Sequence, residues 1–381
     1  MHLIRSIPKK PIAMTTSPDL SALCPYSNLL DPSQISSRFR TVAAQDALRH
    51  ALPAEFGGLG DGFTALVQTH QHLGQASRDP GLVLMVNAHL WGIVFPVLLY
   101  GSAAQRELFL PKLIAGAWLG GHAITEPGCG SDLQAMTTHA EADSGDFVLN
   151  GEKRYITNVP LADWLVVYAK LEGNITAFLV SKDDPGCKFS DTGRLEACRG
   201  SGTGGVLFDN CRIGADRLLG KIGAGAQMIQ KALEYERAFV FAGIAGVMQW
   251  QLDEVVRHSR ERRSGGGHLG KHQAIGHRIA DMKLRLDTIK LWLMECARLA
   301  DAGQRLTLAS AQTKLYAAEA FLQSSLDAVQ IMGAAGLESD SPMLALTQDA
   351  LAGRLFSGSS EVQKNLIAGL LGTGDAYRGK I

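Results

Sequence analysis

Apolar positions recur with a helical spacing at both ends of the chain and with a strand-like spacing in its middle. Up to about residue 120, apolar residues lie three and four positions apart, which predicts helices over 35–52, 62–75, 80–100 and 104–113. After Gly225 the helical spacing returns and continues to the end, with breaks at 264–270, 333–336 and near Gly358. A block of strands between two helical regions indicates an α+β fold.

The middle of the chain consists of short runs rich in β-branched and aromatic residues. Strands are expected over 137–142, 147–149, 154–157, 164–168, 176–180 and 205–208. Turn signals separate them at Asp143-Ser144-Gly145, Asn150-Gly151 and Asp184-Pro185-Gly186. The changes of period predict three domains: a helical domain over 1–121, a β domain over 122–221 and a helical bundle over 222–381.

One apolar stripe in the helix after Gly225 contains a carboxylate. Its members lie three or four residues apart, on one face of a helix: Ile229, Leu233, Glu236, Val240, Ile244 and Val247. A carboxylate on a buried face is disfavoured unless it is paired or has a chemical task, and desolvation moves such a group toward the pKa range of a general base. The stripe alone leaves two alternatives, which are an ion pair with Arg237 or a cation from another helix, and a catalytic base.

Charge and hydropathy narrow the classes of function. Lys+Arg and Asp+Glu both count 37, so the formal net charge is zero. A chain without net charge has no general attraction for a polyanion, and nucleic-acid binding is not expected. Hydrophobic residues make up 46%, which is enough for a large core. No uninterrupted run of about 18 apolar residues occurs, so no membrane span is expected.

Cysteine usage and the start of the chain indicate a cytoplasmic protein. The six cysteines form no CxxC pair and no common zinc spacing, and no metal site is expected. The first ten residues are basic but lack the apolar segment of a secretory signal. Met1 and Met14 are both possible natural starts.

Other local motifs are weak when each is taken alone. The loop Thr125–Asp132 carries glycines and hydroxyls that could hold a phosphate, but taken alone it is better explained as a plain connecting turn. The charged run 260–263 is typical of a solvated helix end, with phosphate binding as the alternative. No GxSxG, P-loop or Rossmann glycine motif occurs.

Together, however, five segments resemble the acyl-CoA dehydrogenase family of flavoenzymes, in the family's order and over nearly the whole chain. They are AITEPGCGSD at 123–132, GEKRYITN at 151–158, RGSGT at 199–203 running on to LLG at 218–220, DAVQIMG at 327–333 and FSGSSEVQ at 356–363. The resemblance implies an N-terminal helical domain, a central β-barrel-like domain and a C-terminal four-helix bundle, with FAD held between the last two.

The same resemblance implies which residues bind the cofactor. They are Ile124, Thr125, Gly130, Ser131, Tyr155, Ile156, Thr157, Arg262, His272, Gln273, Gln330, Ala334, Ser359 and Glu361. Tyr155 would stack beside the flavin ring, and Thr157 would bind near its N5 atom. The positions of Arg262, His272, Gln273, Gln330 and Ala334 reach the FAD of a neighbouring subunit in the family, so a homodimer or homotetramer is implied.

The position of the base departs from the common family pattern. Most members carry the catalytic glutamate directly before the glycine of the last signature, where this chain has Ser357. A minority, resembling isovaleryl- and long-chain-type dehydrogenases, place it on an earlier helix before an arginine, and Glu236-Arg237 matches that place. Because the apolar stripe singles out the same residue, we interpret Glu236 as the catalytic base. A second departure, Ser264–His268 in place of the usual Phe-Gly, affects the expected adenine contact.

The reaction implied by the resemblance is the dehydrogenation of an acyl thioester. Glu236 would take the α-proton and flavin N5 the β-hydride, which leaves a trans-2-enoyl thioester. Substrate positions of the family match Ser131, Glu234, Arg237, Ser357 and Gly358. Ser357 would act through its main-chain N–H, so its replacement by alanine is expected to cost little.

The expected substrate is a short or branched acyl group on CoA or on an acyl-carrier protein, and the expected electron acceptor is an electron-transfer flavoprotein. Two alternatives stay open at this point. Some proteins of this fold are flavin-dependent monooxygenases, which typically lack a carboxylate base, and a non-catalytic FAD-binding homologue is also compatible with the motifs.

Overall fold

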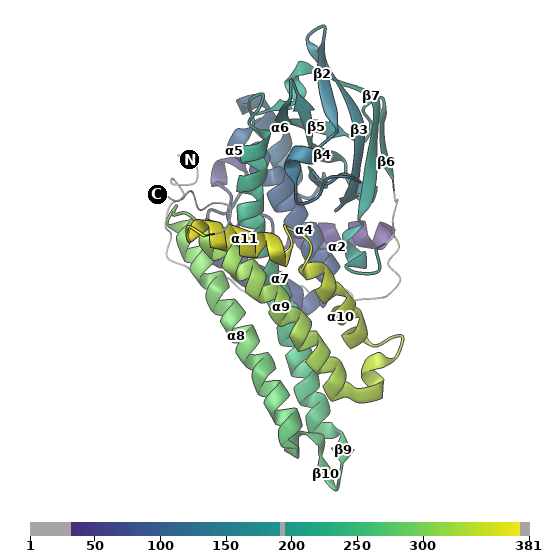
Figure 1. Ribbon diagram of the computed structural model, residues 1–381, viewed down its shortest axis with the longest axis vertical. Helices are drawn as coiled ribbons and strands as arrows, with labels where there is room; N and C mark the ends of the chain where they lie inside the picture. The colour runs from purple at the N-terminus through teal and green to yellow at the C-terminus, as the bar shows by residue number, and fades with distance from the viewer. Residues whose placement is uncertain (1–31, 191–194, 374–381) are drawn as a thin grey trace.

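The structure, a computed structural model, describes residues 32–190 and 195–373. It has three parts along its longest axis (Figure 1): a β-sheet at one end, the N-terminal helices beside and below it, and long C-terminal helices that extend to the other end. The mixed architecture confirms the predicted α+β class. The limits of the three predicted domains stay a prediction, and the two candidate start residues, Met1 and Met14, lie outside the described residues.

The N-terminal part consists of the helices that the apolar spacing predicts. They are α2 (Pro32–Ala44), α3 (Phe63–Ser77), α4 (Pro80–His89), α5 (Phe95–Tyr100) and α6 (Ala103–Ile114). α2 ends eight residues before the predicted limit, and turns follow it. Asp79 begins α4 by accepting hydrogen bonds from the N–H groups of Gly81 and Leu82.

A turn of π-helix, Leu90–Val94, joins α4 to α5, so residues 80–100 form one helical run. This run is long and apolar enough to cross a membrane, but 94% of its most apolar window is buried inside the protein. It lies between the sheet and α7, and it is therefore a core helix.

An eight-stranded sheet forms the middle of the chain. Its strands are β1 (Gly120–Ala123), β2 (His139–Asp143), β3 (Asp146–Ile156), β4 (Trp164–Leu171), β5 (Asn174–Ser181), β6 (Cys187–Ser190), β7 (Gly204–Ile213) and β8 (Leu218–Leu219). The order is β6-β7-β3-β2-β4-β5-β8, with β1 pairing in parallel with β4.

The predicted turn at Asn150-Gly151 is wrong. β3 continues through both residues, and a register shift against β7 between Leu149 and Gly151 marks a bulge there. Gly151 has φ 139°, and a Cβ on it would lie 2.7 Å from the Cα of Thr138. The glycine of this pair therefore allows two neighbouring segments of the sheet to approach each other closely.

The C-terminal part is helical, as predicted. Its elements are α7 (Gly225–Glu261), α8 (Gln273–Asp301), α9 (Thr307–Met332), α10 (Pro342–Gly353) and α11 (Ser360–Leu370). The first two are joined through a small hairpin of β9 (Arg263–Ser264) and β10 (Gly267–His268), where the sequence predicts a break. This hairpin is the lower tip of the molecule in Figure 1.

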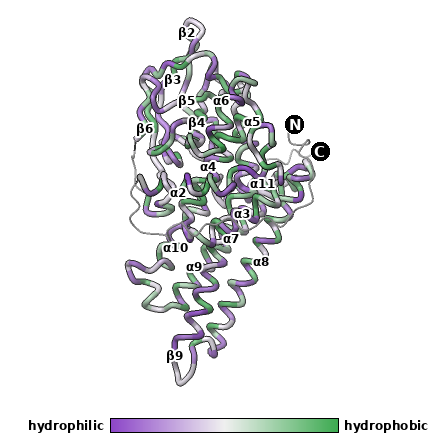
Figure 2. Tube along the Cα trace, turned by 180° about the vertical axis from the view of Figure 1, so that it is seen from behind, coloured by the Kyte–Doolittle hydropathy of each residue, from purple (hydrophilic) through white to green (hydrophobic). Residues whose placement is uncertain are grey.

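Two apolar cores stabilise the structure. One joins the N-terminal helices, α7–α10 and one face of the sheet, and the other fills the opposite face of the sheet. Figure 2 shows apolar and polar residues alternating along α8 and α9, as expected for helices with one buried face. α7 differs because residues 238–248 are all buried.

α3 and α7 cross with their backbones in contact. A Cβ on Gly74 would lie 1.7 Å from the carbonyl oxygen of Gly243, and one on Gly246 would lie 1.9 Å from that of Gln71. Only glycine allows helices to approach this closely. The contact fixes the position of α7, which carries Glu236.

Candidate active site

Glu236 is buried in the first half of α7. The aliphatic members of its stripe are largely or completely buried, and Glu236 itself is 4% exposed. The sequence prediction of a carboxylate on a buried helix face is therefore confirmed. The question that the stripe left open, whether this carboxylate is paired, is answered by its contacts.

Two side chains from distant parts of the chain face the carboxylate of Glu236. The hydroxyl of Ser357, in the loop between α10 and α11, donates a hydrogen bond to Oε1 at 2.5 Å. The Nε2 atom of His122, on β1, lies 3.5 Å from Oε2. Oε2 has no hydrogen-bond partner within the part of the chain that the structure describes. One oxygen of the carboxylate, Oε2, is thus available to accept a further hydrogen bond or a proton.

The ion pair with Arg237 is not formed. The guanidinium Nε instead donates to the main-chain oxygen of Ser357 at 2.9 Å. Burial lowers the pKa of Arg237, against the opposing effect of the nearby carboxylates of Glu236 and Glu234. Arg237 therefore holds the Ser357 loop and does not neutralise Glu236 by direct contact.

The loop that carries Ser357 is held in a definite shape. Ser357 and Gly358 both have left-handed backbone angles, with φ of 55° and 87°. The side-chain amide of Gln363 donates to the carbonyl oxygens of Gly358 at 2.9 Å and of Ser357 at 3.4 Å. Ser359 then begins α11 by accepting from the N–H of Val362 at 3.4 Å.

The end of β3 lies next to His122. A Cβ on Gly121 would lie 3.1 Å from the carbonyl oxygen of Thr157. The amide of Asn158 donates to the carbonyl oxygen of Gly120 at 2.8 Å. Thr157, a predicted flavin contact, is thereby placed beside the strand that carries His122.

Tyr155 is an exposed aromatic residue with an unusual backbone. Its φ is 57° and its side chain is 49% exposed, with the guanidinium of Arg154 5.1 Å from the ring centre. The predicted contacts Ile124 and Ile156 differ, because both side chains are buried in the apolar cores. Only their main-chain atoms are available to a ligand.

The loop Thr125–Asp132 is fixed at its start by a buried ion pair. Lys153 Nζ lies 2.8 Å from Glu126 Oε1 and also donates to the carbonyl oxygen of Ile124 at 3.0 Å. The other donors to Glu126 are the N–H groups of Thr137 and Thr138 and the hydroxyl of Thr137, at 2.6, 3.0 and 2.7 Å. Although burial by itself raises the pKa of Glu126, these hydrogen bonds lower it to about 2.

The rest of that loop is exposed except for Cys129, which is buried. A Cβ on Gly128 or Gly130 would meet no atom within 4 Å, and Gly130 and Ser131 are exposed. The start of the loop is rigid, and its exposed part carries glycines. This combination suits a ligand that lies across the loop.

A second group of predicted site residues lies far from Glu236. Arg262, His272 and Gln273 are exposed beside the hairpin of β9 and β10, and Gln330 and Ala334 are exposed near the end of α9. α7 ends 25 residues beyond Glu236, which is about 38 Å along the helix axis. The structure therefore does not bring these residues to Glu236 within one chain.

The remaining predicted residues are the cofactor contacts on α11 and the substrate contact Glu234, and the structure places them differently. Ser359 and Glu361 lie at the start of α11, directly after the Ser357 loop. Glu234 is engaged elsewhere, because it accepts hydrogen bonds from Lys231 at 2.7 Å and from the Thr307 hydroxyl at 2.6 Å. Its carboxylate holds the start of α9 against α7.

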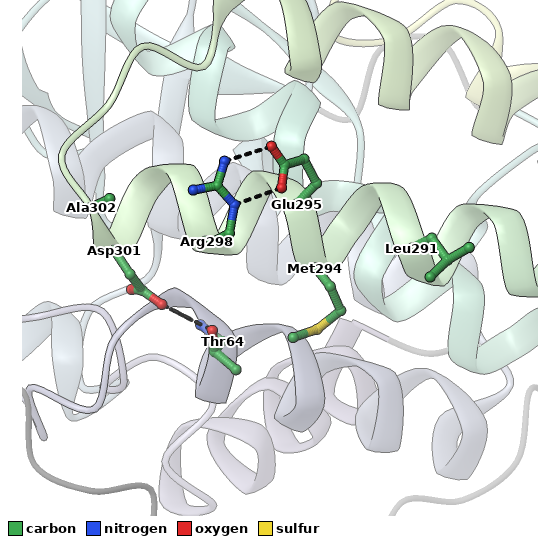
Figure 3. A pocket seen from close by; sticks show the side chains of 7 residues that line it. All are labelled: Thr64, Leu291, Met294, Glu295, Arg298, Asp301 and Ala302. Atoms are coloured by element: carbon green, nitrogen blue, oxygen red, sulfur yellow. Dashed lines mark hydrogen bonds and ion pairs between the residues drawn. The ribbon is translucent and has the colours of Figure 1, made fainter.

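A cavity of about 600 Å³ lies away from this site, between the start of α3 and the end of α8. Figure 3 shows its lining, with Asp301 bonded to Thr64 and Arg298 bonded to Glu295. It contains no residue of the predicted site. No group of three or more His, Cys, Asp or Glu residues able to hold a metal ion occurs within residues 32–190 and 195–373.

Sequence reasoning missed two features of the site. His122 lies three positions before Thr125, in a Gly-Gly-His-Ala strand that carries little β signal. The second feature is the ion pair of Lys153 with Glu126, which links the motif at 151–158 to the motif at 123–132. Opposite charges in two motifs that lie close in the sequence are the signal that could have suggested it.

Comparisons with known proteins agree with the architecture. Three family models match: the N-terminal, middle and C-terminal domains of acyl-CoA dehydrogenase, over residues 31–117, 121–211 and 223–371.

Similar individual proteins include an L-prolyl-[peptidyl-carrier protein] dehydrogenase of Pseudomonas fluorescens, 35% identical over 84% of this chain and 85% of that one. The mitochondrial isovaleryl-CoA dehydrogenase of Pongo abelii is 34% identical over 83% and 76% of the two chains. The solved structure of PigA with FAD and proline has a TM-score of 0.86 at 29% identity, and covers 91% of this chain and 92% of that one.

Proposed function

The chain belongs to the acyl-CoA dehydrogenase family, and we propose that Glu236 is the base of its reaction. The protein is an FAD-dependent oxidoreductase that dehydrogenates an acyl thioester. Its named relatives are dehydrogenases, so monooxygenase chemistry and a non-catalytic role are not favoured. The observation that carries the proposal is the buried carboxylate of Glu236 with one uncommitted oxygen, Oε2.

The residues present suit FAD. Tyr155 offers an exposed aromatic ring, the rim at Gly128 and Gly130 is open, and Thr125 and Thr157 are half-buried next to it. When bound, FAD supplies the acceptor for the hydride that leaves the β-carbon. Tyr155 and Thr157 would hold the ring system, and Ser131 and the loop around it would hold the polar remainder.

Glu236 would remove the proton from the α-carbon. A thioester α-proton is weakly acidic, so its removal needs a dry and positioned carboxylate together with a donor at the carbonyl oxygen. Burial of Glu236 supports the first requirement. The main-chain N–H of Ser357 is the proposed donor, since Arg237 and Gln363 hold that loop through its carbonyl oxygens.

The substrate class follows from the relatives and from the place of the base. We propose a short, branched or cyclic acyl group such as a prolyl group, carried on a peptidyl carrier protein or on CoA. Electrons would then pass to an electron-transfer flavoprotein. The remote residues, Arg262, His272 and Gln273 among them, would reach the cofactor of a second copy, because about 38 Å of helix separates them from Glu236.

An anaerobic titration tests the proposal. The purified flavoprotein is mixed with prolyl-carrier protein, isovaleryl-CoA or butyryl-CoA, and the absorbance of the oxidised flavin is followed. We expect one of these to bleach the flavin and so to name the substrate class. Glu236→Gln should bind FAD but reduce it about 10²–10⁴-fold more slowly.

The matched control is Glu254→Gln, on the same helix, where the carboxylate pairs with Arg257 at the surface. We expect that variant to bleach at the native rate. Full activity of Glu236→Gln would remove Glu236 from the mechanism.

A further inference from the structure

We propose that Ser357 and His122 are positioning residues that hold the carboxylate of Glu236 from two different parts of the fold. Ser357 would bind Oε1 and leave Oε2, oriented by His122, to take the substrate proton. The inference rests on the proposed role of Glu236 as the base. It assigns a task to the side chain of Ser357, for which the sequence predicted only a main-chain task.

The backbone of Ser357 supports a role for its hydroxyl. With φ at 55° the residue lies in the left-handed region, where glycine is favoured and serine is not. Arg237 holds its carbonyl oxygen at 2.9 Å, which fixes the direction in which the side chain leaves the loop. The hydroxyl then meets Glu236 Oε1 at 2.5 Å. A glycine would relieve the backbone but would lose this hydrogen bond.

The position of His122 is equally constrained. A Cβ on Gly92 would lie 2.8 Å from the N–H nitrogen of His122, so β1 is packed directly on the π-helical turn below it. The His122 side chain is 14% exposed, and its Nδ1 has no partner within the described residues. Burial lowers the pKa of His122, against the opposing effect of Glu236, so the ring is neutral at pH 7. A neutral imidazole with its proton on Nε2 presents a donor to Oε2.

The 3.5 Å separation of His122 from Glu236 is longer than an ordinary hydrogen bond. Catalytic contacts of this kind often tighten only when substrate is bound. Before then, His122 restricts the directions that Oε2 can take without fully engaging it. One firm contact and one loose contact therefore orient the base and keep a lone pair for the substrate.

Loss of the Ser357 hydroxyl would remove the one hydrogen bond that the Glu236 carboxylate receives within the described residues. The charged groups around Glu236 are Arg237, bonded to the Ser357 carbonyl oxygen, and Glu234, bonded to Lys231 and Thr307. Neither they nor neutral His122 is altered directly by a change at Ser357.

The test compares Ser357→Gly with Ser357→Ala in single-turnover flavin reduction at pH 7 over a range of substrate concentrations. Both variants lack the hydroxyl, but glycine relieves the left-handed backbone. We expect each to reduce flavin about 10-fold more slowly at saturating substrate, while the substrate concentration that gives half of the maximal rate changes by less than about threefold. Thermal unfolding of Ser357→Gly should occur at or above the native midpoint. A purely structural role predicts that Ser357→Gly reduces flavin as fast as the native enzyme.

A second pair of variants tests His122. His122→Gln keeps a side-chain N–H donor and should retain the native rate within about threefold, whereas His122→Phe fills the space without a donor and should be about 10-fold slower. FAD content and the unfolding midpoint are measured for each. Equal rates for these two variants would overturn the role of His122.

The outcome for Glu236→Gln separates the two proposals. If Glu236→Gln still bleaches the flavin, the base itself is misassigned. If it does not, while Ser357→Gly and His122→Phe are fully active, only the positioning role is refuted.

Discussion

Two buried glutamates of this protein, Glu126 and Glu236, are equally hidden from water but differ in their partners. They are 3% and 4% exposed. Glu126 receives hydrogen bonds from Lys153, from the N–H and hydroxyl of Thr137 and from the N–H of Thr138, whereas Glu236 receives one, from Ser357. The fully bonded carboxylate cannot accept a proton readily, and its pKa is lowered to about 2. Glu126 and the proposed base, Glu236, thus differ in the number of their hydrogen-bond donors and not in their degree of burial.

The hydrogen-bond donors of the two carboxylates also differ in how far they lie from them along the sequence. Lys153 is 27 residues from Glu126, and the other donors are closer. Ser357 is 121 residues from Glu236. The β domain therefore completes the Glu126 site by itself, whereas the Glu236 site exists only when β1, α7 and the loop before α11 are assembled.

The sharpest test of this comparison removes the charge of Glu126. Glu126→Gln leaves the Lys153 ammonium buried without its counter-ion, and we expect the free energy of unfolding to fall by about 3–5 kcal/mol. Denaturant unfolding measures the loss, and the exposed Glu141→Gln on β2 is the control. A loss below about 1 kcal/mol would show that the ion pair does not stabilise the fold. In the native protein this contribution is present above pH 4.5 and is lost as the pH falls toward 2.

A third buried carboxylate, Asp349 on α10, should behave in the opposite way. Its Oδ1 accepts from the N–H of Cys198 at 2.5 Å, but Oδ2 has no partner within the described residues. Burial, aided by the charge of Asp79, raises the pKa of Asp349 to about 7. Because the folded pKa lies above the unfolded value of 3.8, stability should fall as the pH rises from about 4 to 7.

Asp349→Asn should remove this loss, because asparagine mimics the protonated acid. We expect the variant to be more stable than the native protein at pH 8, by up to about 4 kcal/mol, and similar to it at pH 4. Thermal unfolding across that range measures the difference, with exposed Asp340→Asn as the control. Parallel stability curves for the variant and the native protein would contradict the assignment.

The smallest effect on stability is expected at Glu236, the proposed base. In Glu236→Gln the amide oxygen can still accept from Ser357, and a buried charge is removed, so the free energy of unfolding should change by less than about 1 kcal/mol or rise. This contrasts with the 10²–10⁴-fold loss of rate expected for the same variant. Denaturant unfolding beside Glu126→Gln provides the direct comparison. A loss as large as that of Glu126→Gln would mean that Glu236 is also structural.

The sequence predicted burial well and partners poorly. A spacing of three and four residues shows that Glu236 lies on an apolar face, because periodicity records which side of a helix avoids water. It does not record what packs against that side. Ser357 and His122 reach Glu236 only through the assembly of three elements, so their side-chain contacts could not be foreseen. The charge-pair alternative with Arg237 was excluded only by its bond to Ser357.

The same limit explains the errors in the fold. β1 is short and contains two glycines, and it is a strand because it pairs with β4 over Gly120–Ala123. The Asn150-Gly151 pair is a strong local turn signal, but pairing of β3 with both β2 and β7 overrides it. The helical run over 80–100 was predicted with both of its ends correct, and α6 lies within one residue of its predicted limits at each end.

The contact of α3 with α7 limits which parts of the enzyme can adapt to a new substrate. Because the two backbones touch at Gly74 and Gly246, α7 cannot slide or rotate without a collision. The proposed base, Glu236, therefore occupies a fixed point, and we expect any adjustment to a substrate of another size to come from the segment between α10 and α11. We expect adaptation to new acyl groups to accumulate in that segment, while the glycines of the crossing admit almost no variation.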